Sequence, residues 1–205
     1  VNGRPLELNR LELISDAILE IWQPGVNGAL PMAGILSGRI NPSGKLAMTF
    51  PYSTGQIPIY YNRRKSGRGH QGFYKDITSD PLYPFGHGLS YTEFKYGTVT
   101  PSVTKVKRGD RLSVEVTVTN VGARDGAETV HWFISDPYCS ITRPVKELKH
   151  FEKQLIRAGE TKTFRFDIDL ERDFGFVNED GKRFLEAGEY HILVQGQTVK
   201  IELID

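Results

Sequence analysis

The sequence predicts a mainly β protein, in which an immunoglobulin-like β-sandwich follows the end of an α/β layer structure. Apolar residues in the first stretch recur at helical spacing, whereas after Lys95 they alternate with polar residues, as in half-buried strands. Turn signals rich in Gly, Asn and Asp separate the alternating stretches. About seven short strands over roughly 110 residues, with no helical stripe, are typical of this sandwich.

The first 50 or so residues are expected to have the order strand-helix-helix-strand, in which residues 1–5 are the end of a strand running into a loop. One stripe with helical period predicts an amphipathic helix that ends at Pro24 and Gly25. Its members are Ile14, Ala17, Ile18, Ile21 and Trp22. A second short helix is predicted over about residues 29–37, with Pro31 in its first turn. A turn then leads into a short apolar strand at residues 46–50, which completes the end of an α/β layer.

Residues 52–93 lack a clear period and are rich in Tyr, Pro and Gly, which predicts a connector packed by its own aromatic rings. Its aromatic residues include Tyr60, Tyr61, Tyr74, Tyr83, Phe85 and Tyr91. Such rings either stack on sugars or pack a partly wet seam between domains. We favour packing for Tyr83, Phe85 and Tyr91, and leave both interpretations open for Tyr74.

The predicted domain boundary lies near Phe94, between an α/β part at residues 1–93 and a sandwich at residues 94–205. Strands of the sandwich are predicted where large apolar residues recur at every second position. These positions are Leu112, Val114, Val116 and Val118; Val130, Trp132 and Ile134; Phe164, Phe166 and Ile168; and Tyr190, Ile192 and Val194.

Composition excludes several classes of function. Lys and Arg number 26 against 25 Asp and Glu, and this near-neutral balance argues against a binder of nucleic acid or of an anionic membrane. No apolar run approaches the roughly 18 residues of a membrane-spanning helix. A single cysteine, Cys139, excludes an intramolecular disulfide and a cysteine-based zinc site, and it is expected to be an inert thiol.

Several chemical-looking motifs have plainer explanations. Residues 67–72 match G-x-G-x-x-G, but they begin within the basic run at 63–68 and open no helix, so dinucleotide binding is not expected. The basic run is interpreted as a solvated loop tip. The five histidines form no close pair, so neither a metal nor a cofactor is expected. Carboxylates are numerous, yet their spacing identifies no catalytic pair of the kind that glycoside hydrolysis needs.

Three segments and two shorter motifs carry a family resemblance. The first segment is 22–25 (WQPG), 33–38 (AGILSG) and 41–46 (NPSGKL). The second runs from 50–51 (FP) to 57–62 (IPIYYN), and the third is 81–94 (PLYPFGHGLSYTEF). The two motifs are 119–122 (TNVG) and 143–148 (RPVKEL). In this order and spacing they resemble glycoside hydrolase family 3 over essentially the whole chain. His150 departs from the family's glycine and is interpreted as a local turn difference.

This resemblance implies the C-terminal region of a β-glucosidase-type enzyme: the end of a flavodoxin-like α/β domain and a fibronectin type III-like domain. The parent enzyme would cleave terminal β-linked sugars with retention, and would be periplasmic or secreted. The barrel and α/β domains of the parent enzyme would be partners of this chain. The substrate of the parent enzyme would be a β-linked oligosaccharide or glycoside. The family's aspartate nucleophile and glutamate acid/base have no matching position here, so no catalytic residue is assigned. The abrupt start at Val1 fits a fragment with a supporting role.

One loop is nominated for contact with substrate. Residues 63–80 carry polar and aromatic side chains that suit hydrogen bonding and stacking on a sugar at the rim of an active site. The candidates are Arg68, His70, Tyr74 and Asp76. The alternative function is a free-standing carbohydrate-binding or adhesion module without catalytic activity, because a fold alone does not settle function.

Overall fold

A computed structural model describes residues 1–65 and 77–205, and its chain contacts divide it into two compact units. Unit 1 comprises Val1–Tyr61 and Ser66–Tyr91, and unit 2 comprises Asn62–Lys65 and Thr92–Asp205. Each unit is described by itself.

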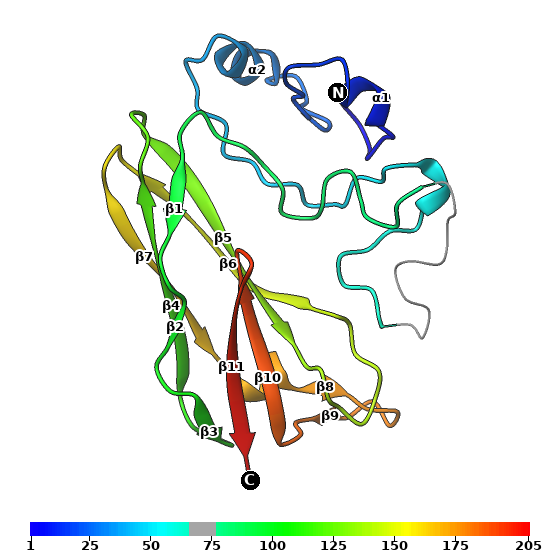
Figure 1. Ribbon diagram of the computed structural model, residues 1–205, viewed down its shortest axis with the longest axis vertical. Helices are drawn as coiled ribbons and strands as arrows, with labels where there is room; N and C mark the ends of the chain where they lie inside the picture. Colours follow the sequence, from blue (N-terminus) through cyan, green and yellow to red (C-terminus); the bar gives the residue numbers. More distant parts are fainter. Residues whose placement is uncertain (66–76) are drawn as a thin grey trace. The chain divides into compact units, whose positions relative to one another are not determined.

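Unit 2 is a β-sandwich (Figure 1). Its strands are β1 Phe94–Tyr96, β2 Thr100–Pro101, β3 Lys105–Lys107, β4 Leu112–Asn120, β5 Gly126–Ser135, β6 Glu147–Ile156, β7 Thr161–Ile168, β8 Phe176–Val177, β9 Arg183–Phe184, β10 Gly188–Val194 and β11 Gln197–Ile204. One turn of π-helix, η2 (Leu170–Phe174), follows β7. The strands predicted from period-two alternation are confirmed as β4, β5, β7 and β10.

Two sheets make up the sandwich. In the first, β4 pairs with β1 and β2 along one edge and with β7 along the other, all antiparallel. The second has the order β3-β11-β10-β5-β6, in which the β3–β11 pair alone is parallel. A separate hairpin joins β8 and β9. The mainly β fold class is therefore confirmed.

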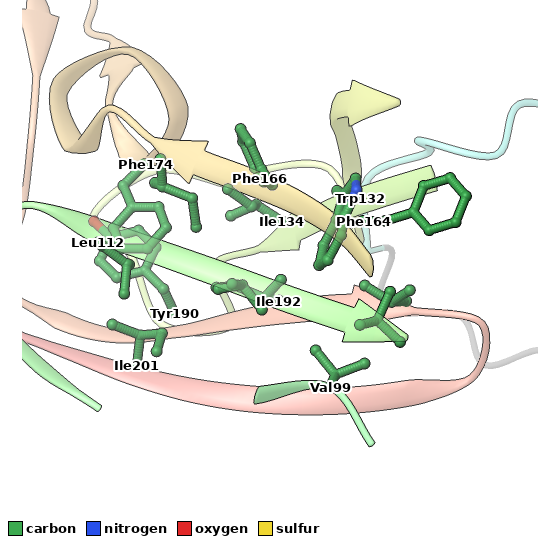
Figure 2. Packing of buried hydrophobic residues seen from close by; sticks show 14 of the residues in the cluster. Val99, Leu112, Trp132, Ile134, Phe164, Phe166, Phe174, Tyr190, Ile192 and Ile201 are labelled. Carbon is green, nitrogen blue, oxygen red and sulfur yellow. The ribbon is translucent and has the colours of Figure 1, made fainter. Parts of the chain in front are cut away.

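The core lies between these sheets, where alternate residues of each strand point inward (Figure 2). Burial along β5 alternates at every residue and places Val130, Trp132 and Ile134 at 0–2% exposure. Each fully buried large side chain contributes about 1.5–3 kcal/mol relative to an exposed one. The sandwich thus has a closed core of its own.

His150 lies within a strand and not at a turn, which corrects the sequence interpretation. It pairs with Trp132 in the β5–β6 ladder, at the point where the register shifts between Trp132 and Phe133. Its ring stacks on Phe166 at a centroid distance of 5.0 Å. The imidazole therefore packs at a β-bulge, where a local change of twist redirects side chains.

Unit 1 contains two short α-helices, α1 (Asn9–Glu12) and α2 (Ala29–Leu36), and one 3₁₀ turn, η1 (Thr54–Gln56). The helix predicted at residues 29–37 is confirmed as α2. Gly38 follows Ser37, the C-cap of α2, and has a φ of 73°. A glycine in this left-handed conformation readily ends a helix.

The amphipathic helix predicted from Ile14 to Trp22 is wrong. Residues 15–22 form no helix; instead, Val1 N donates to Leu19 O at 2.9 Å and Ile21 N donates to Val1 O at 3.0 Å. Residues 17–22, which are apolar except for Glu20, include two β-branched isoleucines, and short stretches of this kind fit a strand as well as a helix. This parallel-type pairing suits the α/β layer.

Residues 46–50 form no regular strand but pair irregularly with residues 82–87. Leu46 N donates to His87 O at 2.8 Å, and Phe50 N donates to Tyr83 O at 2.8 Å. Phe50 and Tyr83 form an isolated antiparallel bridge and their rings meet edge to face. Backbone pairing is therefore present where the sequence predicts a strand, although it is not continuous.

Candidate functional site

The four nominated substrate-binding residues, Arg68, His70, Tyr74 and Asp76, lie outside the described residues. The G-x-G-x-x-G match at 67–72 lies there too. The structure does describe both ends of the nominated loop, at residues 62–65 and 77–80, and the contacts that hold them.

The first end of the loop is fixed by backbone pairing within unit 2. Arg64 forms an isolated antiparallel bridge with Pro144, and Val145 N donates to Arg63 O at 2.8 Å. Proline has no backbone N–H, so the neighbouring valine supplies the donor of this pair. The RPVKEL motif therefore holds the residues at which the loop begins.

Arg143, which precedes that proline, is buried in a network of its own. Its Nη1 donates to Asp136 Oδ2 at 3.0 Å and to Phe174 O at 2.6 Å, while its Nη2 donates to Glu147 Oε1 at 3.1 Å. The Arg143 and Asp136 side chains are 4% and 3% exposed. A planar guanidinium with several donors suits this set of acceptors, which a lysine would not satisfy.

Burial and nearby charges act in opposite directions on the pKa values of the two carboxyl groups that contact Arg143. It raises the pKa of Asp136, while the hydrogen bond and positive charge of Arg143 act in the opposite direction. Lys149 and Arg143 together lower the pKa of Glu147 against the effect of burial. In this network the positive charge of Arg143 offsets the negative charges of Asp136 and Glu147, and its bond to Phe174 O joins the β5–β6 loop to η2.

The second end of the loop is held by Gln56 in unit 1. Its Nε2 donates to Thr78 O at 2.8 Å and to Asp80 O at 3.0 Å. Its Oε1 accepts from Tyr52 N at 2.6 Å. Gln56 also closes a capping box with Ser53 on η1, which keeps the side chain in place. One buried amide therefore joins residues 52–53 to residues 78–80.

Hydrogen bonds inside unit 1 join two of the segments that carry the family resemblance, residues 41–46 and residues 86–91. Asn41 Oδ1 accepts from Ser90 Oγ and from Tyr91 N, both at 2.8 Å. Lys45 Nζ donates to Gly88 O at 3.0 Å. The NPSGKL segment and the FGHGLSY segment are therefore partners, and we call this set of contacts the motif clamp (residues 41–46 and 86–91).

The aromatic residues of the connector pack within unit 1. Phe85 stacks on Tyr61 at a centroid distance of 4.3 Å, and Tyr83 stacks on His87 at 5.0 Å. The Tyr91 hydroxyl donates to Ile35 O at 2.9 Å. These rings have packing partners in their own unit, whereas the sequence prediction placed Tyr83, Phe85 and Tyr91 at a seam between domains, which these contacts do not test.

Buried acids in the described residues have structural partners. Glu128 accepts from the Tyr96 hydroxyl at 2.7 Å, and Asp173 binds Arg172 and the backbone N–H of Asp169. Burial and the nearby Glu128 charge raise the pKa of Tyr96, so this hydroxyl stays a donor. Such engaged carboxylates stabilise the fold and are not arranged as a general acid and a nucleophile.

In residues 1–65 and 77–205, no group of three or more His, Cys, Asp or Glu side chains is arranged to hold a metal ion. His131 and His191 lie in β5 and β10. Cys139 is a free thiol whose Sγ donates to Ile141 O at 2.7 Å, and burial raises the pKa of this thiol. No helix in the described chain is both long and apolar enough to cross a membrane.

Comparisons with known proteins place this geometry in a family. Residues 1–91 match the glycosyl hydrolase family 3 C-terminal domain, and residues 128–198 match the fibronectin type III-like domain. The chain belongs to glycosyl hydrolase family 3 and corresponds to its C-terminal region.

Named relatives share nearly the whole chain. A periplasmic β-glucosidase of Salmonella typhimurium is 40% identical over 98% of this chain and 27% of its own length. A β-xylosidase of Formosa agariphila is 38% identical over 95% of this chain and 27% of its own. The solved β-glucosidase of Listeria innocua in complex with glucose has a TM-score of 0.93 and 40% identity over 98% of this chain and 30% of that one. The chain thus spans less than a third of these relatives.

Sequence reasoning missed two buried polar side chains: Arg143, next to the proline that pairs with the first end of the loop, and Gln56, which holds the second end. Arg143 lies in a motif that the family resemblance had already identified, but its burial and partners depend on segments far away in the sequence. For Gln56 a local signal existed, because Ser53 and Gln56 have the S-x-x-Q spacing of a capping box.

Proposed function

We propose that this chain is the C-terminal, non-catalytic part of a retaining, exo-acting β-glycosidase that hydrolyses terminal β-linked sugars. The observation that carries the proposal is the match along 95–98% of the chain to relatives named β-glucosidase and β-xylosidase, of which it spans only 27%. The buried acids Glu128, Asp136 and Asp173 bond to side chains of the sandwich, which favours a structural role for this part of the enzyme.

Exposed apolar side chains in unit 1 support the presence of further protein as a partner, namely the barrel and α/β domains. Leu13 and Ile14 are 82% and 83% exposed, and Leu30 and Leu36 of α2 are 74% and 72% exposed. Exposure of several large apolar side chains fits a surface that another part of a protein covers. A free-standing adhesion module would instead be expected to present a closed surface.

Retention of configuration is testable in the parent enzyme. Proton NMR of the first product released from an aryl β-glucoside should show the β-anomer before mutarotation, because a covalent intermediate inverts the anomeric carbon twice. First appearance of the α-anomer would contradict this mechanism.

The proposal includes substrate contact by the loop at residues 63–80, with Arg68, His70, Tyr74 and Asp76 hydrogen-bonding or stacking on the sugar. The polar and aromatic composition of the loop supports it, and both described ends have backbone partners, Arg64 with Pro144 and Thr78 with Gln56. In the parent enzyme, Tyr74→Ala should raise KM for a disaccharide by about tenfold, on the order of 1.4 kcal/mol.

A matched control for that variant is Tyr60→Ala. Tyr60 is a tyrosine of the same connector, 66% exposed, and is not among the proposed contacts. We expect its kinetic constants to stay near those of the parent. Unchanged KM and kcat in the Tyr74 variant would remove the loop from the proposal.

Two further points belong to this proposal. The domain boundary lies near Phe94, which the start of β1 at that residue and the change of compact unit after Tyr91 support. The parent is periplasmic or secreted, which the periplasmic Salmonella relative supports. Secretion is testable by fractionating cells of the source organism and assaying each fraction with an antibody to this chain.

A further inference from the structure

One end of the sandwich carries an open hollow of about 720 Å³. The turn between β3 and β4, the loop between β5 and β6, and the segment between β9 and β10 supply most of its lining. Its volume falls within the range of small-molecule sites, and loops at the end of a sandwich are common places for binding. We call it the loop-end hollow.

Two exposed aromatic rings line this hollow. Tyr138, in the β5–β6 loop, is 77% exposed, and Phe184, in β9, is 47% exposed. Phe184 packs edge to face against Phe176 at a centroid distance of 5.7 Å, which restricts the ring while leaving part of it open to solvent. Exposed rings present a flat apolar face with negative electrostatic potential, which suits the C–H groups on one side of a pyranose ring.

The segments around the hollow are joined by hydrogen bonds. Ser140 N donates to Glu186 Oε2 at 3.0 Å, and this joins the β5–β6 loop to the β9–β10 segment. Arg108 Nη2 donates to Leu185 O at 3.0 Å, and this joins the β3–β4 turn to the same segment. These links hold the polar groups in place before any ligand arrives, which lowers the entropic cost of binding.

The β5–β6 loop is also fixed from beneath. Tyr138 N donates to Asp136 Oδ1 at 3.3 Å, and Asp136 is the buried partner of Arg143. The backbone that carries the exposed tyrosine is therefore anchored to the core. An anchored backbone with an exposed ring differs from a mobile loop tip, where an aromatic side chain has no fixed position.

Charges around the hollow are mixed. Arg108 is positive and Glu186 and Asp205 are negative, and all three line it. Arg108 is also paired with Glu171 at 3.2 Å. The lining thus has one cation and two carboxylates, with no positive excess that would attract an anionic ligand. The carboxylates accept hydrogen bonds from hydroxyl groups and the two rings offer apolar faces, which suits a neutral polyhydroxylated ligand.

We propose that the loop-end hollow binds a β-linked oligosaccharide, with Tyr138 and Phe184 contacting sugar faces and Arg108, Ser140 and Glu186 available to the hydroxyl groups. The choice of a β-linked sugar rests on the proposed function, since the parent enzyme would act on such chains. Because the hollow is open and shallow, the affinity is weak, with Kd on the order of 1 mM.

The test is a titration of the 205-residue chain with cellotetraose and with laminaritetraose, followed by calorimetry and by NMR shifts of backbone amides. We expect saturable binding, with the largest shifts at Tyr138, Ser140 and Glu186. Tyr138→Ala and Phe184→Ala should each weaken binding by about tenfold or more. Tyr138 is highly exposed, so its substitution should leave the thermal unfolding temperature nearly unchanged.

Phe151→Ala is the matched control, because Phe151 is 62% exposed on β6 and does not line the hollow. It should bind both tetrasaccharides like the unsubstituted chain. The proposal is overturned by absence of saturable binding, or by binding that Tyr138→Ala and Phe184→Ala leave intact. Self-association that depends on Tyr138, with no sugar binding, would also overturn it in favour of a contact between two copies.

Failure here and failure of the proposed function are distinguishable. Hydrolysis of a short aryl β-glucoside by the parent enzyme does not require the loop-end hollow, so Tyr138→Ala should leave its kcat/KM unchanged. Loss of sugar binding by the chain with retained hydrolysis by the parent would remove only the binding site. Absence of hydrolysis by the parent would remove the proposed function itself.

Discussion

Asn120 and Arg143 are buried polar side chains that hold loops to the sandwich through backbone carbonyls. Asn120 Nδ2 donates to Arg124 O at 2.7 Å and to Ile156 O at 2.9 Å. Its Oδ1 accepts from Thr92 Oγ1 at 2.7 Å. Because a buried amide with all its partners is stabilising and a partly satisfied one is costly, each such residue has a large effect for its size.

Replacing Asn120 with Ala should lower the free energy of unfolding of the chain by about 3 kcal/mol, since one buried carbonyl, one partly buried carbonyl and one hydroxyl lose their hydrogen bond to this amide. Urea denaturation followed by tryptophan fluorescence, with Trp132 in the core as the reporter, measures this change. Asn62→Ala, at an exposed asparagine of the same unit, should stay within about 0.5 kcal/mol. Equal effects of the two variants would contradict the role of Asn120.

Arg143→Ala should destabilise the chain by about 3–5 kcal/mol, because it leaves the buried Asp136 without its cation. Equilibrium unfolding in urea gives the difference. Lys105→Ala removes an exposed ion pair with Glu202 and should cost less than about 1 kcal/mol. If Arg143→Ala destabilises the chain no more than Lys105→Ala does, the buried network does not hold the β5–β6 loop.

His87 should make the stability of unit 1 depend on pH. Burial, and secondarily the charge of Lys45, lowers the pKa of His87 below its usual value near 6.5. The unfolded chain therefore binds the proton more readily, so stability is full above about pH 6.5 and falls as pH drops through the lowered pKa. Thermal unfolding between pH 7.5 and 5.5 should show this loss, and His87→Gln should reduce the slope. An unchanged slope would contradict the assignment.

At the scale of elements, the motif clamp depends on a close backbone approach at Gly88. A Cβ there would lie 2.2 Å from Gly44 O, whereas a Cβ at Gly44 would meet nothing within 4 Å. Gly88→Ala should destabilise unit 1 by about 2 kcal/mol through this overlap, and Gly44→Ala should be nearly neutral. Amide hydrogen exchange at residues 41–46 reads out the effect locally. Equal protection in both variants would count against the clamp.

Strands in which apolar and polar residues alternate regularly were predictable from the sequence, whereas a stretch whose apolar spacing fits both a helix and a strand was not. Alternation along β4, β5 and β7 identified these strands because one face of each is buried against the other sheet. The pattern of residues 17–22 fits a helix or a strand equally well, and in the folded chain residues 19–22 instead hydrogen-bond with residues 1–3. Contacts such as Arg143 with Phe174 join segments that only the folded chain brings together, so no local pattern announces them.

At the scale of the whole molecule, the two units differ in how complete their packing is. Unit 2 has a continuous core in which Trp132, Phe164 and Ile192 are fully buried. Unit 1 leaves large apolar side chains such as Leu13 and Ile14 exposed. This difference fits a chain whose sandwich is self-sufficient and whose α/β part packs against further protein, as the relatives of much greater length suggest.

The central claim is that this chain supports catalysis without performing it, and the activity of the purified chain tests it most directly. Incubation with 4-nitrophenyl β-glucoside and β-xyloside should release no nitrophenol above the buffer rate, while the parent enzyme hydrolyses at least one of them. Turnover that copurifies with the chain and is abolished by substituting one of its own carboxylates would contradict the account.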